Sequence, residues 1–378
     1  MESQPSDINE AIEASGEVTL EQATNKAKEE TDSLLNVRLD IAVTGETGSG
    51  KSSLVNALRG LKDSDEDAAP VGVTETTTEP TPYQHPTMPN VTLWDLPGIG
   101  SSNFKAKTYL KNVKFDRYDF FLIVSSGRFR ENDIMLAKEI KKKKKVFYFV
   151  RSKTDLDVQF EKERKGIDKE ETLSNIRRNS EEELKGIGNP KIFLVSSWDT
   201  SEFDFEKLID TLESELPEHK QSALLQSVPV YSVAILERKV RMFQKAAWAV
   251  ALASGAIAVA PVPGLSVSSD IAMVGSFFTS IYHSFGLDDK SLERLSERVN
   301  KPHLKSLKMS PLVEELIQMS SLRLGASALG VFLCSLVPVA GSAAAAAISF
   351  TTTRTVLLKG LDALAEEARK VLREAGLE

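Results

Sequence analysis

The feature that most constrains this chain is the glycine-rich stretch GETGSGKSS at residues 45–53. It fits the pattern G-x-x-x-x-G-K-[ST], in which the backbone wraps closely around phosphate groups and turns its N–H groups toward them. Lys51 supplies a positive charge to the β- and γ-phosphates, and the Ser52 hydroxyl is placed to bind magnesium. The run at 38–45 predicts a strand before the loop, and residues 52–60 predict a helix after it. The stretch therefore predicts a P-loop.

Length and composition describe a folded chain of more than one domain. The chain has 378 residues, of which 41% are hydrophobic and 27% charged. The formal net charge of -7 argues against a nucleic-acid partner, because such partners select basic surfaces. One cysteine, Cys334, excludes an internal disulfide framework and fits a reducing compartment. The polar start of the chain does not have the pattern of a signal peptide and lacks a myristoylation glycine, so we expect synthesis in the cytosol.

Strand-like and helix-like segments alternate from residue 36 to residue 216. Apolar runs occur at 91–96, 119–124, 146–150 and 191–196, and helical stretches occur near 132–144, 169–185 and 203–215. This alternation is typical of βαβ units. We therefore predict an α/β domain over 36–216, with a mostly parallel sheet and helices on both faces.

The rest of the chain reads as helical. Residues 1–35 are polar with a helical stretch around 8–35, and 217–378 is rich in helix-forming apolar runs. Residues 246–269 and 324–353 carry no charge, and each is interrupted by a Pro- and Gly-containing break. A spanning helix needs about 20 apolar residues, and the breaks leave shorter arms. These two apolar hairpins are therefore either the core of a helical bundle or re-entrant membrane segments, and Cys334 is either a core residue or a palmitoylation site.

A second motif, WDLPG, supplies Asp95 and Gly98 at the end of an apolar strand. A carboxylate at this place holds Mg²⁺ through water, and a glycine N–H there can reach the γ-phosphate. The phosphate-contacting residues that we expect in the P-loop are Gly45, Glu46, Thr47, Gly48, Ser49, Gly50, Lys51, Ser52 and Ser53.

A third motif, FYFVRSKTD, has the pattern of a loop that recognises the base of a nucleotide. A carboxylate at Asp155 accepts hydrogen bonds from the N1–H and amino group of guanine, whereas adenine would leave it unpaired. The stem of Lys153 can lie over the base plane. Ser152 stands where Asn or Thr is usual, which we expect to weaken one supporting hydrogen bond. The sequence LVSSWD places Ser196 and Ser197 near guanine O6. These motifs predict a GTP site.

The group that orients the attacking water is not evident. The residues after the DLPG motif have no side-chain amide that could hold water. The loop between Leu61 and Asn90 contains Thr77, our candidate for a second Mg²⁺ ligand, with the carboxylates Glu75 and Glu79 beside it. Because Asp95 is committed to the metal, Glu75 is the best candidate to orient water.

Several stretches together resemble the interferon-inducible immunity-related GTPases. They are GETGSGKSSLVNALRG, PNVTLWDLPGIG, YDFFLIVSS, FYFVRSKTD and the Thr- and Pro-rich loop. Lys51 makes the chain similar to the branch of that family with GKS rather than GMS. The resemblance implies a Ras-like G domain and an all-α helical domain built from the 1–35 and 217–378 segments. It also places Glu75 on the family's catalytic switch-loop glutamate and Thr77 on its switch threonine.

The same resemblance implies a partner set. GTP is bound and hydrolysed to GDP with Mg²⁺, and the protein forms homodimers or larger homo-oligomers through the G domain. It implies that cytoplasmic protein partitions to intracellular membranes, including vacuoles that enclose pathogens.

Two other functional classes remain open. A ribosome-assembly GTPase would need a basic RNA-binding tail, which the acidic balance disfavours. A nucleotide-switched scaffold with negligible turnover would fit the missing Gln. The lysine run 141–145 is either a solvated helix C-terminus or a contact for anionic lipid.

Overall fold

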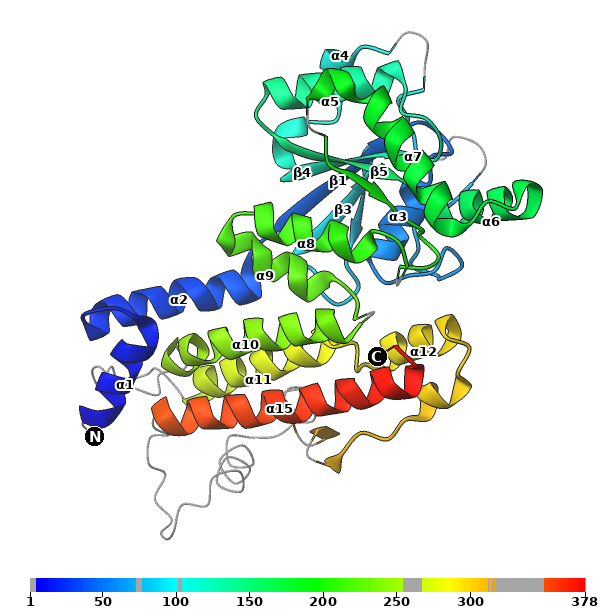
Figure 1. Cartoon of the computed structure of the whole chain (residues 1–378). Coiled ribbons are helices and arrows are strands. Elements are labelled where there is room, and N and C mark those ends of the chain that lie inside the picture. Colours follow the sequence, from blue (N-terminus) through cyan, green and yellow to red (C-terminus); the bar gives the residue numbers. More distant parts are fainter. Residues whose placement is uncertain are drawn as a thin grey trace. The chain divides into compact units, whose positions relative to one another are not determined.

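The structure is a computed structural model that describes residues 5–72, 77–100, 104–188, 190–200, 202–230, 232–253, 267–311, 313–314, 316 and 350–377. It divides into two compact units (Figure 1). Arg38–Val228 forms the nucleotide domain, and Met1–Val37 with Pro229–Glu378 forms the helical domain. The expected boundary at residue 216 falls earlier than this division, because helix α9 (Glu218–Ser227) lies against strands of the nucleotide domain.

The nucleotide domain is built on one six-stranded sheet with the order β2-β3-β1-β4-β5-β6. The strands are β1 (Leu39–Gly45), β2 (Thr81–Gln84), β3 (Val91–Asp95), β4 (Phe120–Ser125), β5 (Val146–Arg151) and β6 (Ile192–Leu194). Only β2 runs antiparallel, against β3, and the other pairs are parallel. Strand β1 is buried along its whole length, as expected for a central strand covered on both faces.

Helices cover both faces of this sheet (Figure 1). The helices are α3 (Lys51–Leu58), α4 (Ala106–Asn112), α5 (Glu131–Lys142), α6 (Thr154–Lys165), α7 (Lys169–Glu183), α8 (Phe205–Glu215) and α9, with short 3-10 turns η1 (Phe115–Arg117) and η2 (Lys185–Ile187). On one face, Phe121 and Ile123 of β4 pack with Leu110 of α4 and with Leu136 and Ile140 of α5. Helices α3 and α9 contact β1 and β3.

Strand β2 and helices α4 and α6 were not predicted, and each has a local reason. Strand β2 is four residues long and contains Pro82, which belongs on an edge strand. Helix α4 is short and has no capping side chain, and α6 follows Lys153, an N-cap residue whose φ of 57° is unusual for a residue with a side chain. Short or weakly capped elements leave little periodicity to read.

The helical domain combines segments from both ends of the chain. It contains α1 (Pro5–Ser15), α2 (Leu20–Asn36), α10 (Val233–Ala253), α11 (Val267–Ser284), α12 (Asp289–Arg298), the 3-10 helix η3 (Pro302–Ser306) and α15 (Phe350–Ala375). The single helical stretch expected over 8–35 is two helices, separated at Gly16 and restarted by a capping box at Thr19. Helix α2 packs along α10, which also packs along α15.

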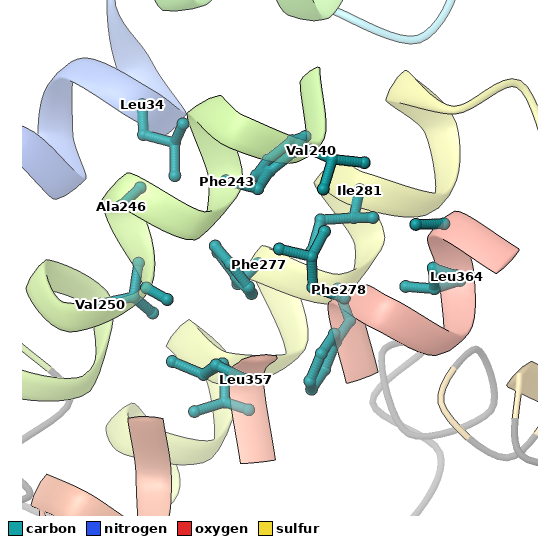
Figure 2. Close-up of a cluster of buried hydrophobic side chains, with 14 of the residues drawn as sticks. Leu34, Val240, Phe243, Ala246, Val250, Phe277, Phe278, Ile281, Leu357 and Leu364 are labelled. Carbon is teal, nitrogen blue, oxygen red and sulfur yellow. The ribbon is translucent and has the colours of Figure 1, made fainter. Parts of the chain in front are cut away.

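A continuous apolar core joins these helices. Figure 2 shows Leu34 of α2, Phe243 and Val250 of α10, Phe277 of α11 and Leu357 of α15 converging on it. The segment 246–252, which begins the first uncharged stretch, is buried throughout. A helix that is apolar on all sides is typically buried, so this segment is bundle core.

The remainder of the two apolar hairpins, 254–266 and 324–349 with Cys334, lies outside the described residues. Among the described helices, none is both long enough and apolar enough to cross a membrane.

Candidate nucleotide-binding site

The predicted motifs meet at one edge of the sheet. The P-loop follows β1, the DLPG turn follows β3, and the base-reading loop follows β5. These strands are parallel, so their carboxyl ends lie together. In open α/β sheets, ligands bind outside the carboxyl ends of the strands at the point where the strand order reverses. Here β1 lies between β3 and β4, which puts the P-loop at that point.

The P-loop backbone requires glycine at its first position. Gly45 has a φ of 146°, and a Cβ atom there would come within 2.0 Å of the Val124 carbonyl oxygen of the neighbouring strand. Gly50, with a φ of 86°, is the N-cap residue of α3 and so turns the chain into the helix. The loop therefore presents the N-terminus of α3, where backbone N–H groups and the helix dipole favour an anion.

Lys51 is almost completely buried in this loop, with 8% of its surface exposed. Its Nζ atom donates a hydrogen bond to the Glu46 carbonyl oxygen at 3.0 Å, so the ammonium group lies back across the loop. The Glu46 side chain points to another partner and forms an ion pair with Arg130 at 3.1 Å. Thr47 and Gly48 are exposed at the tip of the loop, and Ser49 is buried.

The three predicted magnesium ligands lie together. The Ser52 hydroxyl donates to Asp95 Oδ2 at 2.7 Å, and the Thr77 hydroxyl donates to the same oxygen at 3.1 Å. The other oxygen, Asp95 Oδ1, is buried and has no hydrogen-bond partner among the described residues. Burial raises the pKa of Asp95, and the Ser52 hydrogen bond and the charge of Lys51 oppose that rise.

This arrangement fits a magnesium ion. Two hydroxyls and a carboxylate are hard oxygen donors, and the buried Asp95 Oδ1 still needs a partner. The described residues contain no cluster of three His, Cys, Asp or Glu side chains that could hold a metal ion by themselves. Mg²⁺ commonly binds through one or two protein groups, waters and substrate phosphates, so such a cluster is not needed.

The base-reading loop is fastened to the P-loop. The Ser152 hydroxyl is buried and donates to the Ser49 carbonyl oxygen at 2.6 Å, so serine at this position does make a supporting hydrogen bond. Lys153 Nζ donates to the Gly48 carbonyl oxygen at 3.0 Å, which lays its stem along the loop. Both contacts fix the distance between the phosphate and base ends of the site.

Asp155 stands in the first turn of α6 and is half-buried. Its carboxylate makes no hydrogen bond or ion pair within the part of the chain that the structure describes, whereas Asp157 pairs with Arg151 at 2.6 Å and holds the helix against β5. The helix thus fixes the position of Asp155 in the backbone, and its acceptor oxygens have no hydrogen-bond partner within the described residues.

The other residues predicted to contact the nucleotide are Ser196, Ser197 and Gly98, and they differ in burial and in hydrogen bonding. Ser196 is fully buried, and its hydroxyl accepts the N–H groups of Trp198 and Asp199, so it shapes its own loop. Ser197 is half-buried. Gly98 sits in the DLPG turn, which the Ile99 N–H ties to the Gly45 carbonyl oxygen at 3.2 Å.

Glu75 and the neighbouring residues 73–76 lie outside the described residues. Glu79 is described and exposed.

Sequence reasoning missed Tyr109 of α4. Its hydroxyl donates to the Pro97 carbonyl oxygen at 3.0 Å and shares a 2.7 Å hydrogen bond with the Thr44 hydroxyl. Thr44 directly precedes the P-loop, and Pro97 belongs to the DLPG turn. In the same region the Asn132 side chain donates to the Ile99 carbonyl oxygen at 2.7 Å. These contacts hold the DLPG turn from outside the motif, and no local pattern marks them.

Tyr109→Phe is expected to slow GTP turnover about fivefold and leave GDP affinity unchanged. The change removes one hydroxyl that positions the DLPG turn, and a hydrogen bond of this kind contributes about 1 kcal/mol. GDP lacks the γ-phosphate that Gly98 would contact. Turnover and GDP titration should be compared with Tyr83→Phe, which keeps the ring under Arg59. A parallel loss of GDP affinity would mean that Tyr109 supports the whole fold instead.

Comparisons with known proteins agree with this class of site. The sequence profile of the interferon-inducible GTPase (IIGP) family matches residues 4–375. The chain is 43% identical over 362 residues to interferon-inducible GTPase 5 of Bos taurus, covering 93% of this chain and 78% of that protein. It is 41% identical over 313 residues to interferon-inducible GTPase 1 of Mus musculus, covering 79% and 75% of the two chains.

Among solved structures, an NFeoB variant of S. thermophilus bound to GDP and AlF4- is 14% identical, covers 85% of this chain and 99% of that chain, and has a TM-score of 0.30.

The parallel sheet, P-loop and base-reading loop define a GTPase with a separate helical domain. The chain belongs to the interferon-inducible GTPase family. It binds guanine nucleotides and hydrolyses GTP.

Proposed function

We propose that this chain hydrolyses GTP to GDP with Mg²⁺ and self-assembles in its GTP state on intracellular membranes, as part of defence against pathogens in vacuoles. The observation that carries the nucleotide switch is the convergence of Ser52 and Thr77 on one oxygen of Asp95. Thr77 lies in the loop beside the site, so a change in what its hydroxyl contacts would move that loop. The membrane and the pathogen come from the family resemblance, as does a cytoplasmic pool of protein.

Different residues would bind the phosphates, the magnesium ion and the base. Lys51 would transfer its ammonium group from the Glu46 carbonyl to the β- and γ-phosphate oxygens, where a charge-assisted hydrogen bond is stronger. A bound Mg²⁺ ion would neutralise developing charge on the phosphates, and Ser52, Thr77 and Asp95 are the groups that would hold it. Asp155 would accept the two donors of the guanine edge, and the stem of Lys153 would cover the ring.

The site has few candidate side chains that could orient the attacking water. Asp95 would be committed to the magnesium ion, and Glu46 is held by Arg130, so neither carboxylate is available to orient water. The residues after the DLPG motif have no side-chain amide. We therefore assign water orientation to Glu75, in the loop next to Thr77. A carboxylate beside the γ-phosphate is repelled by it, so its productive placement needs a second protein copy to hold the loop.

This assignment makes assembly and hydrolysis one process. Copies that pair across the nucleotide face would order each other's switch loops and raise turnover. Right-angle light scattering tests the assembly: scattering should rise when Mg²⁺ and GTP are added and fall as GTP is consumed. GDP should leave it unchanged. Equal scattering with GDP and GTP would remove the nucleotide from control of assembly.

Glu75→Ala is expected to bind GTP and assemble, and to hydrolyse GTP at least about tenfold more slowly. Loss of the water-orienting group raises the barrier by roughly 1.4 kcal/mol or more. Single-turnover hydrolysis and the lifetime of the scattering signal measure this directly, and the assembled state should persist longer. Glu79→Ala, an exposed carboxylate of the same loop, is the matched control. Parental turnover in Glu75→Ala would move the role to Glu79 or to the substrate itself.

A further inference from the structure

Exposed lysines gather on one side of the nucleotide domain, over α4, η1 and the C-terminal half of α5. We call this surface the lysine face and define it by Lys107, Lys111, Lys114, Lys138, Lys143 and Lys144, all of which are exposed. Helices α4 and α5 pack against each other, so the six residues belong to adjoining elements.

Contacts on this surface bring the lysines of α4 and α5 together. The positive charges of Lys107, Lys142 and Lys143 all help to hold the pKa of Glu139 below its usual value, with the Lys142 hydrogen bond as the main cause. Lys143 Nζ lies 4.2 Å from the centre of the Phe115 ring in η1. Lys107 and Lys143 therefore lie near the same carboxylate, and the other lysines of the face lie on elements that adjoin these two.

Very little negative charge balances this surface. In residues 105–117 the only acidic residue is Asp116, and in residues 138–145 it is Glu139, which is already paired with Lys142 at 2.6 Å. This concentration of positive charge occurs in a chain whose net charge is -7. Clusters of like charge repel one another and do not stabilise a fold, so a negatively charged partner is the natural complement.

Folding accounts for part of the lysine run 141–145 and leaves the lysine face unexplained. Lys141 Nζ donates to the Ile187 carbonyl oxygen at 2.8 Å, and Lys145 Nζ donates to the Asp116 carbonyl oxygen at 3.0 Å. By contrast, five side chains of the face make no hydrogen bond or ion pair within the described ranges: Lys107, Lys111, Lys114, Lys138 and Lys144.

We propose that the lysine face docks the nucleotide domain on a membrane rich in anionic headgroups. A cluster of about 4 to 8 basic residues is the size that anionic lipid surfaces recognise. Lysines are strongly hydrated point charges suited to a diffuse anionic surface, whereas arginines are favoured for bidentate recognition. Arg117, at the edge of the face, is stacked over Trp94 at 3.6 Å. This proposal rests on the proposed membrane function and names the lipid chemistry and the contact.

A nucleic-acid partner fits this face less well. Single-stranded nucleic acid is held by exposed aromatic rings as well as charge. The only aromatic ring in η1 is Phe115, which is half-buried and lies beneath Lys143. The large exposed aromatic side chains among the described residues, Phe160 and Trp198, belong to α6 and to the loop after β6.

Flotation with phosphatidylserine-containing vesicles tests the proposal. The test protein is the full chain carrying Lys111→Glu and Lys144→Glu, and its control carries Lys162→Glu and Lys207→Glu, which make the same charge change on α6 and α8. At about 0.15 M ionic strength the face variant should float at least about tenfold less than the parent, and the control variant should match the parent. GTP turnover should be unchanged in both. Binding of the parent should fall when salt is raised and when phosphatidylcholine replaces the anionic lipid.

The possible failures are distinguishable. If the face variant floats like the parent, or if the two variants lose binding equally, the lysine face is not the docking surface, although membrane binding stands. If the parent floats with neither vesicle in any nucleotide state, the proposed membrane function itself fails. If the parent binds a single-stranded RNA oligonucleotide through these lysines and ignores the vesicles, the partner is nucleic acid and the proposal is overturned.

Discussion

Lys51→Ala is expected to weaken GTP binding by at least about 100-fold and to abolish measurable GTP turnover. The buried ammonium group would give up at least two charge-assisted hydrogen bonds to the β- and γ-phosphates, each contributing about 1.5 to 3 kcal/mol. In the free protein the same group donates to a backbone carbonyl oxygen of the loop itself, so we expect the fold to survive its loss. Titration calorimetry with GTP and GDP gives the affinities, and circular dichroism checks the fold.

Ser52→Asn is the companion to this change and should separate charge from metal binding. It removes the hydroxyl that reaches Asp95 at 2.7 Å and keeps Lys51. We expect it to bind GDP, to fail to hydrolyse GTP and to show no GTP-dependent scattering. For Lys51→Ala, the control for loss of one positive charge is Lys162→Ala, on the surface of α6. Scattering that still rises with GTP in either P-loop variant would mean that assembly is independent of the P-loop.

Asp155→Asn is expected to lower GTP affinity by at least about 100-fold and to shift the preference toward xanthine nucleotides. The carboxylate accepts the two donors of guanine, and an amide at this position would instead face one of them with its own donor. Xanthine carries a carbonyl oxygen in place of the guanine amino group and so accepts from the Asn amide. Mismatches of buried donors and acceptors discriminate by factors of about 10⁴. Competition of labelled GDP with GTP, XTP and ATP measures the change.

Asp157→Asn is the matched control, two residues further along α6. It breaks the 2.6 Å pair with Arg151 and so tests general damage to the helix. This variant should lose some stability and keep its guanine preference. If unlabelled ATP displaces GDP from the parent as well as GTP does, the base-reading role of Asp155 is wrong.

The parts of the fold that could be predicted from sequence are those with strong local patterns. The central strands are buried on both faces, so their sequences are continuous apolar runs, and the P-loop glycines have no substitute at their backbone angles. Strand β2 and helix α4 are short and are stabilised by their neighbours, which a local pattern does not record. The break between α1 and α2 depends on one glycine and one capping threonine.

The candidate site also contains residues that could be predicted from the sequence and residues that could not. Ser52 and Asp95 were expected in one place because their motifs follow strand ends that the sheet brings together, and Thr77 was expected beside them as a second magnesium ligand. Tyr109 could not have been found, because it reaches Thr44 across 65 positions of sequence and looks like an ordinary apolar helix residue. Ser152 was expected to be a weak support, and only the close approach of Ser49 makes its short side chain sufficient.

The most direct test of the central claim, that pairing of two copies completes the GTPase site, is turnover per molecule at increasing protein concentration. Mass action raises the paired fraction as protein is concentrated over roughly two decades. The account predicts low specific activity in dilute protein and a steep rise with concentration, with Glu75→Ala remaining low throughout. Specific activity that stays constant across the whole range would contradict it, because a single copy would then contain everything that hydrolysis needs.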